Sequence, residues 1–83
     1  MESYYLYQCK GPETVLQFRM NDAVVKVRPT GRPECPYYFL LNGESVFMQP
    51  TGRRKAPYTF SWLGQSVVVQ RTQAPKAAYE FRM

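Results

Sequence analysis

The sequence of 83 residues contains no histidine, and this absence removes the side chain that most often serves as a general base. Without histidine, neither a Ser/His/Asp triad nor a Cys/His pair can be assembled. The six carboxylates are too dispersed along the chain to indicate an acid–base pair, and the glycines stand singly rather than in a phosphate-binding loop. We therefore expect no catalytic residues and a protein that is not an enzyme.

Cysteine is also scarce, because the chain contains only Cys9 and Cys35. Two cysteines are too few for a disulfide framework, and alone they do not make a structural zinc site. Both lie in segments that are predicted to reach the same end of the molecule, so a bridge between them is geometrically possible. Since no export signal indicates an oxidising compartment, two free thiols are the preferred interpretation. No metal and no cofactor are expected.

Long apolar runs are absent as well, since no stretch approaches the roughly 20 residues that span a bilayer. The first residues lack the basic, apolar and small-residue pattern of a signal peptide. These features predict a cytoplasmic protein with no membrane partner. A chain of 83 residues has room for one domain, residues 1–83. A domain of this size buries only roughly 60% of its unfolded surface, so we expect a modest margin of stability.

What the chain does contain is a repeat of 21 residues. The segment Pro29–Gln49 reads PTGRPECPYYFLLNGESVFMQ, and Pro50–Gln70 reads PTGRRKAPYTFSWLGQSVVVQ. A weaker copy precedes them at Gln8–Arg28. A fourth copy is split between the termini, because residues 71–83 match the first half of a unit and residues 3–6 match the second half. The pattern indicates four units whose two ends close a ring.

Each unit has the pattern of a β-hairpin. In the second unit apolar residues alternate over Tyr37–Leu41, the pair Asn42-Gly43 follows, and alternation resumes over Val46–Met48. Alternation is typical of strands with one buried face. Asn-Gly suits a two-residue turn because both central residues need positive φ, and Asn21-Asp22 and Leu63-Gly64 occupy the same place in their units.

The alternation assigns 20 residues to one buried face. They are Tyr4, Leu6, Leu16, Phe18, Met20, Val25, Val27, Tyr37, Phe39, Leu41, Val46, Met48, Tyr58, Phe60, Trp62, Val67, Val69, Tyr79, Phe81 and Met83. The split unit pairs the first strand, about residues 3–8, with the last, about residues 77–83, which leaves no free sheet edge. We predict an all-β fold, an eight-stranded antiparallel meander of four hairpins closed into a small barrel with pseudo-fourfold symmetry. A sandwich of two sheets built from the same hairpins is the alternative.

Positive charge is in excess, since 11 Lys and Arg against six Asp and Glu give a net charge of +5. The excess gathers in the connectors between hairpins, whereas the hairpin tips are neutral to acidic. Two connectors share the sequence Pro-Thr-Gly-Arg, a predicted type II turn that presents Arg32 and Arg53 in equivalent places. Turn shape alone is the competing explanation for Pro-Thr-Gly, and solubility for the basic run Arg53-Arg54-Lys55. The predicted polyanion-binding residues are Arg32, Arg53, Arg54, Lys55, Arg71 and Lys76.

The second hairpin departs from the outward polar pattern of the others. Its outward positions include Tyr38, Leu40 and Phe47, and the first strand adds Tyr5 and Tyr7. An exposed apolar patch rimmed by polar residues commonly marks a partner surface. These five residues form the predicted protein interface, and self-association to a homo-oligomer is one use for it.

Together these features predict a small basic binding protein that engages nucleic acid or another acidic partner through its connectors. The alternative is a protein-interaction module, such as a small inhibitor or adaptor, that docks through the apolar patch and uses its basic connectors for electrostatic steering. Base stacking requires exposed aromatic rings, and the outward candidates Tyr5, Tyr7 and Tyr38 lie on the wall of the barrel rather than at its end. Recognition of single strands is therefore the less favoured form of nucleic-acid binding.

Overall fold

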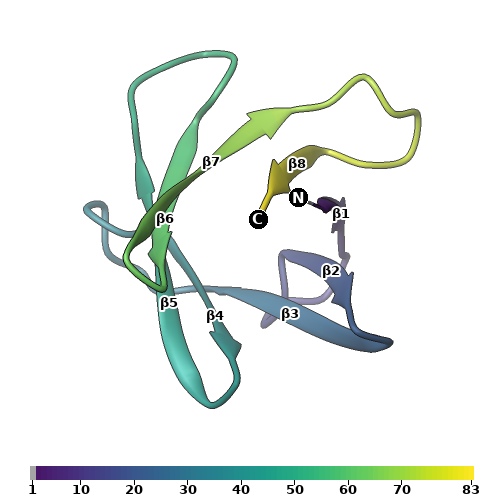
Figure 1. The fold of residues 1–83 in the computed structure, drawn as a ribbon, viewed down its shortest axis with the longest axis horizontal. Helices are drawn as coiled ribbons and strands as arrows, with labels where there is room; N and C mark the ends of the chain where they lie inside the picture. The colour runs from purple at the N-terminus through teal and green to yellow at the C-terminus, as the bar shows by residue number, and fades with distance from the viewer. Residues whose placement is uncertain (1) are drawn as a thin grey trace.

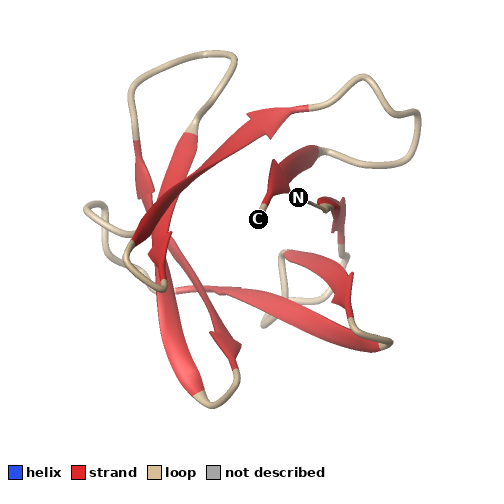
Figure 2. Ribbon diagram, in the orientation of Figure 1, coloured by secondary structure: helices blue, strands red, loops and turns tan. Residues whose placement is uncertain are grey.

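The chain folds into eight antiparallel strands that form a closed barrel (Figures 1 and 2). The computed structural model describes residues 2–83. The strands are β1 (Ser3–Gln8), β2 (Leu16–Met20), β3 (Ala23–Pro29), β4 (Tyr37–Leu41), β5 (Glu44–Pro50), β6 (Tyr58–Trp62), β7 (Gln65–Arg71) and β8 (Tyr79–Arg82). The predicted barrel is confirmed, and the alternative of two packed sheets is not adopted. Across residues 2–83 there is no helix of the length and hydropathy needed to span a membrane.

The two ends of the chain complete the barrel. Strand β1 pairs with β8 in a register that runs from Ser3 opposite Arg82 to Leu6 opposite Tyr79. Beyond β1 and β8, the Glu2 amide donates to the Met83 carbonyl at 3.0 Å, and the Met83 amide donates to the Glu2 carbonyl at 3.2 Å. Glu2 and Met83 therefore lie side by side, Figure 1 shows β1 next to β8, and the predicted pairing of first and last strands is correct.

The other three hairpins turn over two residues each. Their central residues have positive φ, at 50° and 64° for Asn21-Asp22, 51° and 79° for Asn42-Gly43, and 51° and 76° for Leu63-Gly64. Positive φ at both positions is the geometry of a type I′ turn, whose twist matches that of the flanking strands. The left-handed region costs an ordinary L-residue roughly 1–2 kcal/mol, so Leu63 is held there against its own preference.

Pairing is extensive within hairpins and short between them. Each of the pairs β2–β3, β4–β5 and β6–β7 has five residue pairs, and the register repeats at intervals of 21, as in Leu16 opposite Val27 and Tyr37 opposite Met48. The junctions β1–β2, β3–β4, β5–β6 and β7–β8 each have only two pairs. We call these junctions seams. Each seam is paired beside its connector, and its strands are unpaired with one another toward the hairpin tips.

All 20 residues assigned to the inner face contribute to the core. Twelve are buried, and the other eight are half-buried and pack against them. Two further residues, Val15 and Ala78, also pack against the core. The alternation missed them because they precede β2 and β8 and lie in connectors, where the Val15 amide donates to the Val27 carbonyl and the Ala78 amide to the Leu6 carbonyl.

Four phenylalanines, one from each unit, form a closed ring in the middle of the barrel. Phe18, Phe39, Phe60 and Phe81 are 1–3% exposed. Neighbouring rings lie 5.1–5.3 Å apart between centroids, with interplanar angles of 84–90°. Each ring thus meets the next edge to face, an arrangement that contributes about 0.5–1.5 kcal/mol per pair beyond the burial of area.

Replacement of Phe60 tests the energetic weight of this ring. Phe60→Ala removes contacts to both Phe39 and Phe81 and leaves a cavity, so we expect a loss of about 3–5 kcal/mol in the free energy of unfolding. The measurement is urea unfolding followed by the fluorescence of Trp62, the one tryptophan of the chain.

Two variants serve as controls for this test. Phe60→Leu refills part of the cavity and should lose less than half as much as Phe60→Ala. Phe47→Ala removes an outer phenylalanine that is 45% exposed, and its cost should stay below about 1 kcal/mol. Equal costs at Phe60 and Phe47 would contradict a central role for the ring.

Candidate functional site

The second and third connectors, residues 30–36 and 51–57, are ordered loops of the same design. The Thr30 amide donates to the Pro36 carbonyl at 3.0 Å, the Thr30 hydroxyl donates to the Cys35 carbonyl, and the Arg32 amide donates to Thr30 Oγ1 at 3.0 Å. Thr51 makes the corresponding three bonds. Gly31 and Gly52 both have a φ of 79°, which fits the glycine position of the predicted type II turn.

These bonds separate what the turn requires from what it does not. Threonine supplies the hydroxyl, and glycine supplies the positive φ, so both are explained by the loop. The arginines that follow contribute only their backbone amides, and the side chains of Arg32 and Arg53 are exposed. The shape of the turn therefore explains the threonine and the glycine of both connectors. It does not explain why an arginine follows them.

Arg71, at the end of β7, holds the third connector against the barrel. Its backbone amide donates to the Lys55 carbonyl at 2.9 Å, and its Nε donates to the Arg54 carbonyl at 2.8 Å. The basic run Arg53-Arg54-Lys55 is thereby fixed next to a fourth cation. Four of the six predicted polyanion-binding residues are brought together in this way.

The other two predicted residues extend the same end of the barrel. Arg32 lies in the second connector and Lys76 in the fourth, residues 72–78, and both side chains are exposed. In a closed meander all connectors lie at the end opposite the hairpin tips. We call the six residues together the basic rim: Arg32, Arg53, Arg54, Lys55, Arg71 and Lys76.

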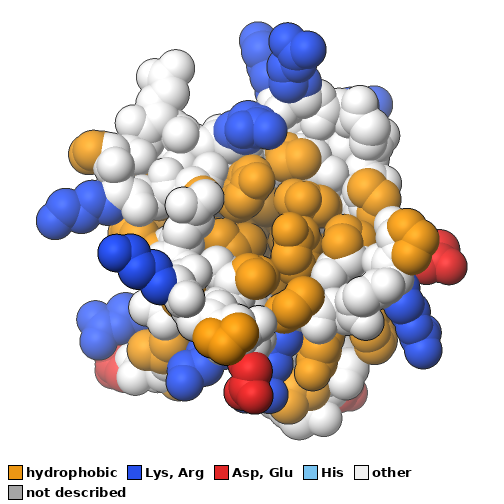
Figure 3. Space-filling model, turned by 180° about the vertical axis from the view of Figure 1, so that it is seen from behind, with side chains coloured by type: hydrophobic (Ala, Val, Ile, Leu, Met, Phe, Trp, Pro, Cys, Tyr) orange, Lys and Arg blue, Asp and Glu red, His pale blue; other side chains and the backbone are white. Residues whose placement is uncertain are grey.

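An aromatic cluster occupies the inner positions nearest the connectors. Tyr37, Tyr58 and Tyr79 begin β4, β6 and β8, and their rings meet edge to face at 5.3 Å and 5.8 Å. All three are only half-buried. Figure 3 shows one face of the barrel with hydrophobic side chains gathered at its centre and Lys and Arg around them. The alternation predicted these tyrosines as core, and their partial exposure depends on their place at the end of the barrel.

Tyr58 is the most perturbed ionisable group of the cluster. Burial raises the pKa of the Tyr58 phenol to about 12, and the adjacent Tyr37 phenol adds to the rise, while the charge of Arg71 lowers it. At neutral pH the Tyr58 hydroxyl therefore keeps its proton.

The predicted protein interface divides into two separate places. Leu40 and Phe47 are 57% and 45% exposed on β4 and β5. The prediction that Tyr38 is exposed was wrong. Tyr38 is half-buried, because its ring stacks on that of Phe47, with 5.9 Å between the ring centroids and an interplanar angle of 30°. Tyr5 and Tyr7 are exposed, but β1 is separated from β4 by β2 and β3. We call Tyr38, Leu40 and Phe47 the outer patch.

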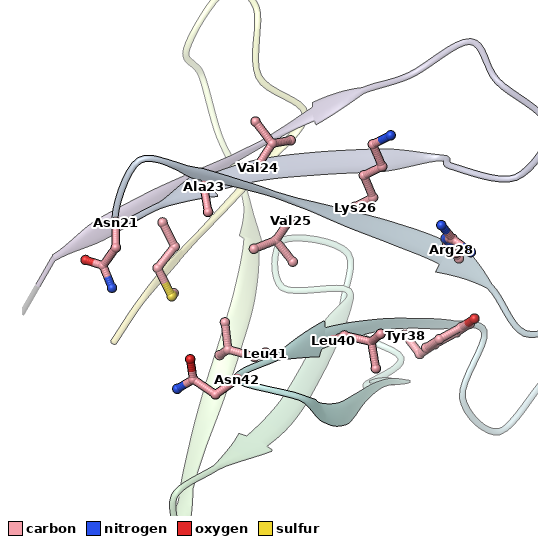
Figure 4. Close-up of a pocket in the computed structure, with 11 residues that line it drawn as sticks. Asn21, Ala23, Val24, Val25, Lys26, Arg28, Tyr38, Leu40, Leu41 and Asn42 are labelled. Carbon is pink, nitrogen blue, oxygen red and sulfur yellow. The ribbon is translucent and has the colours of Figure 1, made fainter.

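The alternation did not single out Val24, which is exposed on β3, the strand that faces β4 across a seam. Val24 stands in the apolar run Ala23-Val24-Val25, which hides its outward position. A groove of about 500 Å³ lies in this seam (Figure 4), lined by Val24 together with Tyr38 and Leu40 of the outer patch.

Neither cysteine is paired. Cys9 and Cys35 are free and half-buried, and the Cys9 thiol donates to the Tyr7 carbonyl at 3.9 Å. Within residues 2–83, no three His, Cys, Asp or Glu side chains gather in a group that could hold a metal ion.

No protein-family model, curated protein or solved structure matches this chain.

The raised pKa of Tyr58 predicts a dependence of stability on alkaline pH. Because the folded state keeps the phenol protonated up to about pH 12, its contribution is complete below the unfolded pKa of about 10 and is lost as the pH rises through the folded value. Tyrosinate absorbance of the folded protein, compared with that of Tyr58→Phe, isolates the titration of Tyr58. A midpoint of the difference near pH 10 would show that the phenol is not desolvated.

Proposed function

We propose that the protein is a non-enzymatic binding protein for nucleic acid or another polyanion, and that the basic rim is its contact surface. The observation that carries the proposal is the double hydrogen bond of Arg71 to the carbonyls of Arg54 and Lys55. It joins Arg71 of β7 to an ordered loop in which the side chains of Arg53, Arg54 and Lys55 are exposed.

Electrostatics favours a repetitive anion as the ligand. Each phosphate that is neutralised by Lys or Arg releases condensed counterions, so affinity is gained without readout of sequence. Arginine adds planar, bidentate contacts to phosphate and can stack on bases. The half-buried tyrosine cluster offers aromatic surface at the same end of the barrel as the cations.

The rigidity of the connectors supports binding with little ordering cost. Thr30 and Thr51 each tie their loops through three hydrogen bonds, so the backbone that carries Arg32 and Arg53 is already ordered before a ligand arrives. Binding then requires little ordering of this backbone, and the ordering cost within the protein is that of the side chains, about 0.5–1.5 kcal/mol for each one immobilised.

Removal of the basic run tests the proposal. The triple variant Arg53→Ala, Arg54→Ala, Lys55→Ala should fold normally and lose affinity for nucleic acid. The slope of log K against log salt is negative, and its magnitude should decrease by roughly 2–3. Three phosphate contacts are lost, and each releases about 0.7–0.9 of a counterion. The measurement is fluorescence anisotropy with mixed-sequence single- and double-stranded probes at several salt concentrations.

The matched control removes the same number of charges from the barrel wall. Arg19→Ala, Lys26→Ala, Arg82→Ala changes three exposed cations on β2, β3 and β8 and should retain most of the affinity. Equal losses in the two triple variants would mean that net charge alone drives binding. A lack of binding by the unchanged protein at low salt would remove the proposal.

The outer patch supports a second candidate function, docking to another protein or to a second copy of this chain. Leu40 and Phe47 are among the most exposed large apolar side chains of residues 2–83, at 57% and 45%. The stacked pair Tyr38 and Phe47 presents a preformed aromatic surface, and rigid aromatic residues are common anchors of protein interfaces.

Substitution within the outer patch tests this second function. Tyr38→Ser with Phe47→Ser should abolish association, measured by light scattering for self-association and by affinity capture for other proteins, while the fold is preserved. Val68→Ser is the control, because Val68 is exposed at the position 21 residues after Phe47. Association that survives the double substitution would exclude the outer patch.

A further inference from the structure

The groove in the β3–β4 seam is lined by residues of both faces of the barrel wall. Its volume is about 500 Å³, within the range of pockets that bind ligands. The residues that line it come from the core side and from the solvent side of the two strands, as Figure 4 shows for those it labels. On the core side they include Met20, Val25 and Leu41, and on the solvent side Val24, Lys26 and Leu40.

The backbone of the seam is available for pairing. Strands β3 and β4 pair only at Arg28 opposite Tyr38 and at Pro29 opposite Tyr37. In an antiparallel ladder, alternate residues direct their N–H and C=O groups away from the partner strand. Because Ala23 closes a two-residue turn on β2, this alternation directs the backbone groups of Val24 and Lys26 toward β4. They lie beyond the last β3–β4 pair, on an edge that another strand can use.

The fold does not require the apolar lining of this groove. The β7–β8 seam has the same two-pair junction and a groove of about 330 Å³. That groove is lined by Ser66, Gln70, Glu80 and Arg82, with charges of both signs, together with the apolar Val67, Val68 and Phe81. The same backbone arrangement therefore tolerates a more polar seam, and the more apolar lining of the β3–β4 seam needs another reason.

Charge specifies what kind of ligand would complement the groove. Lys26 and Arg28 line it, and no carboxylate is among its lining residues. Both cations belong to β3 and have exposed side chains. Asn21 and Asn42, at the tips of the two hairpins, add amide groups at the opposite end of the groove.

We propose that the β3–β4 groove binds an extended peptide segment of a partner protein, in which apolar side chains alternate with carboxylates, as an added strand along β3. The inference rests on the second candidate function, protein docking beside the outer patch, and assigns that function a ligand class. It is independent of polyanion binding by the basic rim.

The alternation follows from the position of the groove in the wall of the barrel. Successive side chains of an added strand point to opposite faces. One set reaches Met20, Val25 and Leu41 and is apolar, whereas the other set faces solvent beside Lys26 and Arg28 and is acidic. The edge from Ala23 to Val27 spans about 13 Å at roughly 3.3 Å per residue, so a six-residue segment covers it.

Three synthetic hexapeptides with blocked ends test the proposal. The first alternates glutamate with valine, the second has the same composition with the three glutamates before the three valines, and the third alternates lysine with valine. Each is titrated into the ¹⁵N-labelled protein and followed by amide chemical shifts. We expect the alternating acidic peptide to bind at least tenfold more tightly than either of the others, with the largest shifts at Val24, Lys26 and Leu40.

Variants of the protein locate the site. Lys26→Glu with Arg28→Glu should reverse the preference toward the lysine peptide. Leu40→Thr should weaken binding of the acidic peptide at least fivefold, and the control Val68→Thr, at an exposed valine of β7, should not change it. The basic-run variant Arg53→Ala, Arg54→Ala, Lys55→Ala should bind the peptide as the unchanged protein does.

The proposal is overturned if no hexapeptide shifts the groove residues at millimolar concentration, or if the two acidic peptides bind equally. Shifts confined to the connectors, or loss of peptide binding in the basic-run variant, also overturn it and assign the acidic peptides to the basic rim. A third outcome is that no peptide binds in the groove while Tyr38→Ser with Phe47→Ser abolishes binding of a protein partner. That result supports docking at the outer patch and contradicts strand addition.

Discussion

The fold depends on the closed ring of Phe18, Phe39, Phe60 and Phe81. Each of the four side chains meets two neighbours at nearly a right angle, so the four rings close on one another and every ring has two edge-to-face contacts. Each ring belongs to a different unit, and the ring therefore fixes how the four units face the axis of the barrel. Because strand side chains alternate, fixing one inner residue of a strand also fixes which residues point to solvent.

This constraint leaves two regions whose chemistry the core does not dictate. At the connector end, the backbone is held by threonine and glycine, while the exposed arginines have no part in the turn. In the seams, strand pairing ends after two residue pairs, and the lining of one seam is mainly apolar with two cations while that of another is more polar. The residues that differ among the four units thus lie in the connectors and seams, where the core does not determine the side chain. Both proposed binding surfaces consist of such residues.

Much of the architecture could be predicted because several signals agree. Alternation within strands, the Asn-Gly tip and the 21-residue period each point to hairpins, and the unit split between the termini points to closure. The inner residues followed from the alternation alone. Contacts between distant segments could not be predicted in this way, because no local pattern pairs Arg71 with the carbonyl of Arg54.

The groove in the β3–β4 seam was also beyond a sequence pattern. Its existence depends on how far two neighbouring hairpins separate, and this is set by packing around the whole barrel rather than by either strand. The half-burial of Tyr58 has a similar origin, since the alternation assigns a side to each residue but not its depth along the axis. The sequence therefore predicts to which face of the sheet a side chain points. How deeply a side chain is buried along the barrel axis, and how far apart neighbouring hairpins lie, depend on the assembled barrel.

The pairing of β1 with β8 has a consequence for how the chain folds. The other hairpins close over two-residue turns, whereas Tyr4 and Phe81 are opposite one another from the two ends of the chain. The entropy lost on closing a loop grows with its length, and non-local pairing slows folding. We infer that the three local hairpins form first and that ring closure limits the folding rate. Until the ring closes, β1 and β8 are open edges. Because closure is the slowest step, these two edges stay exposed to other chains for longer than any other part of the sheet.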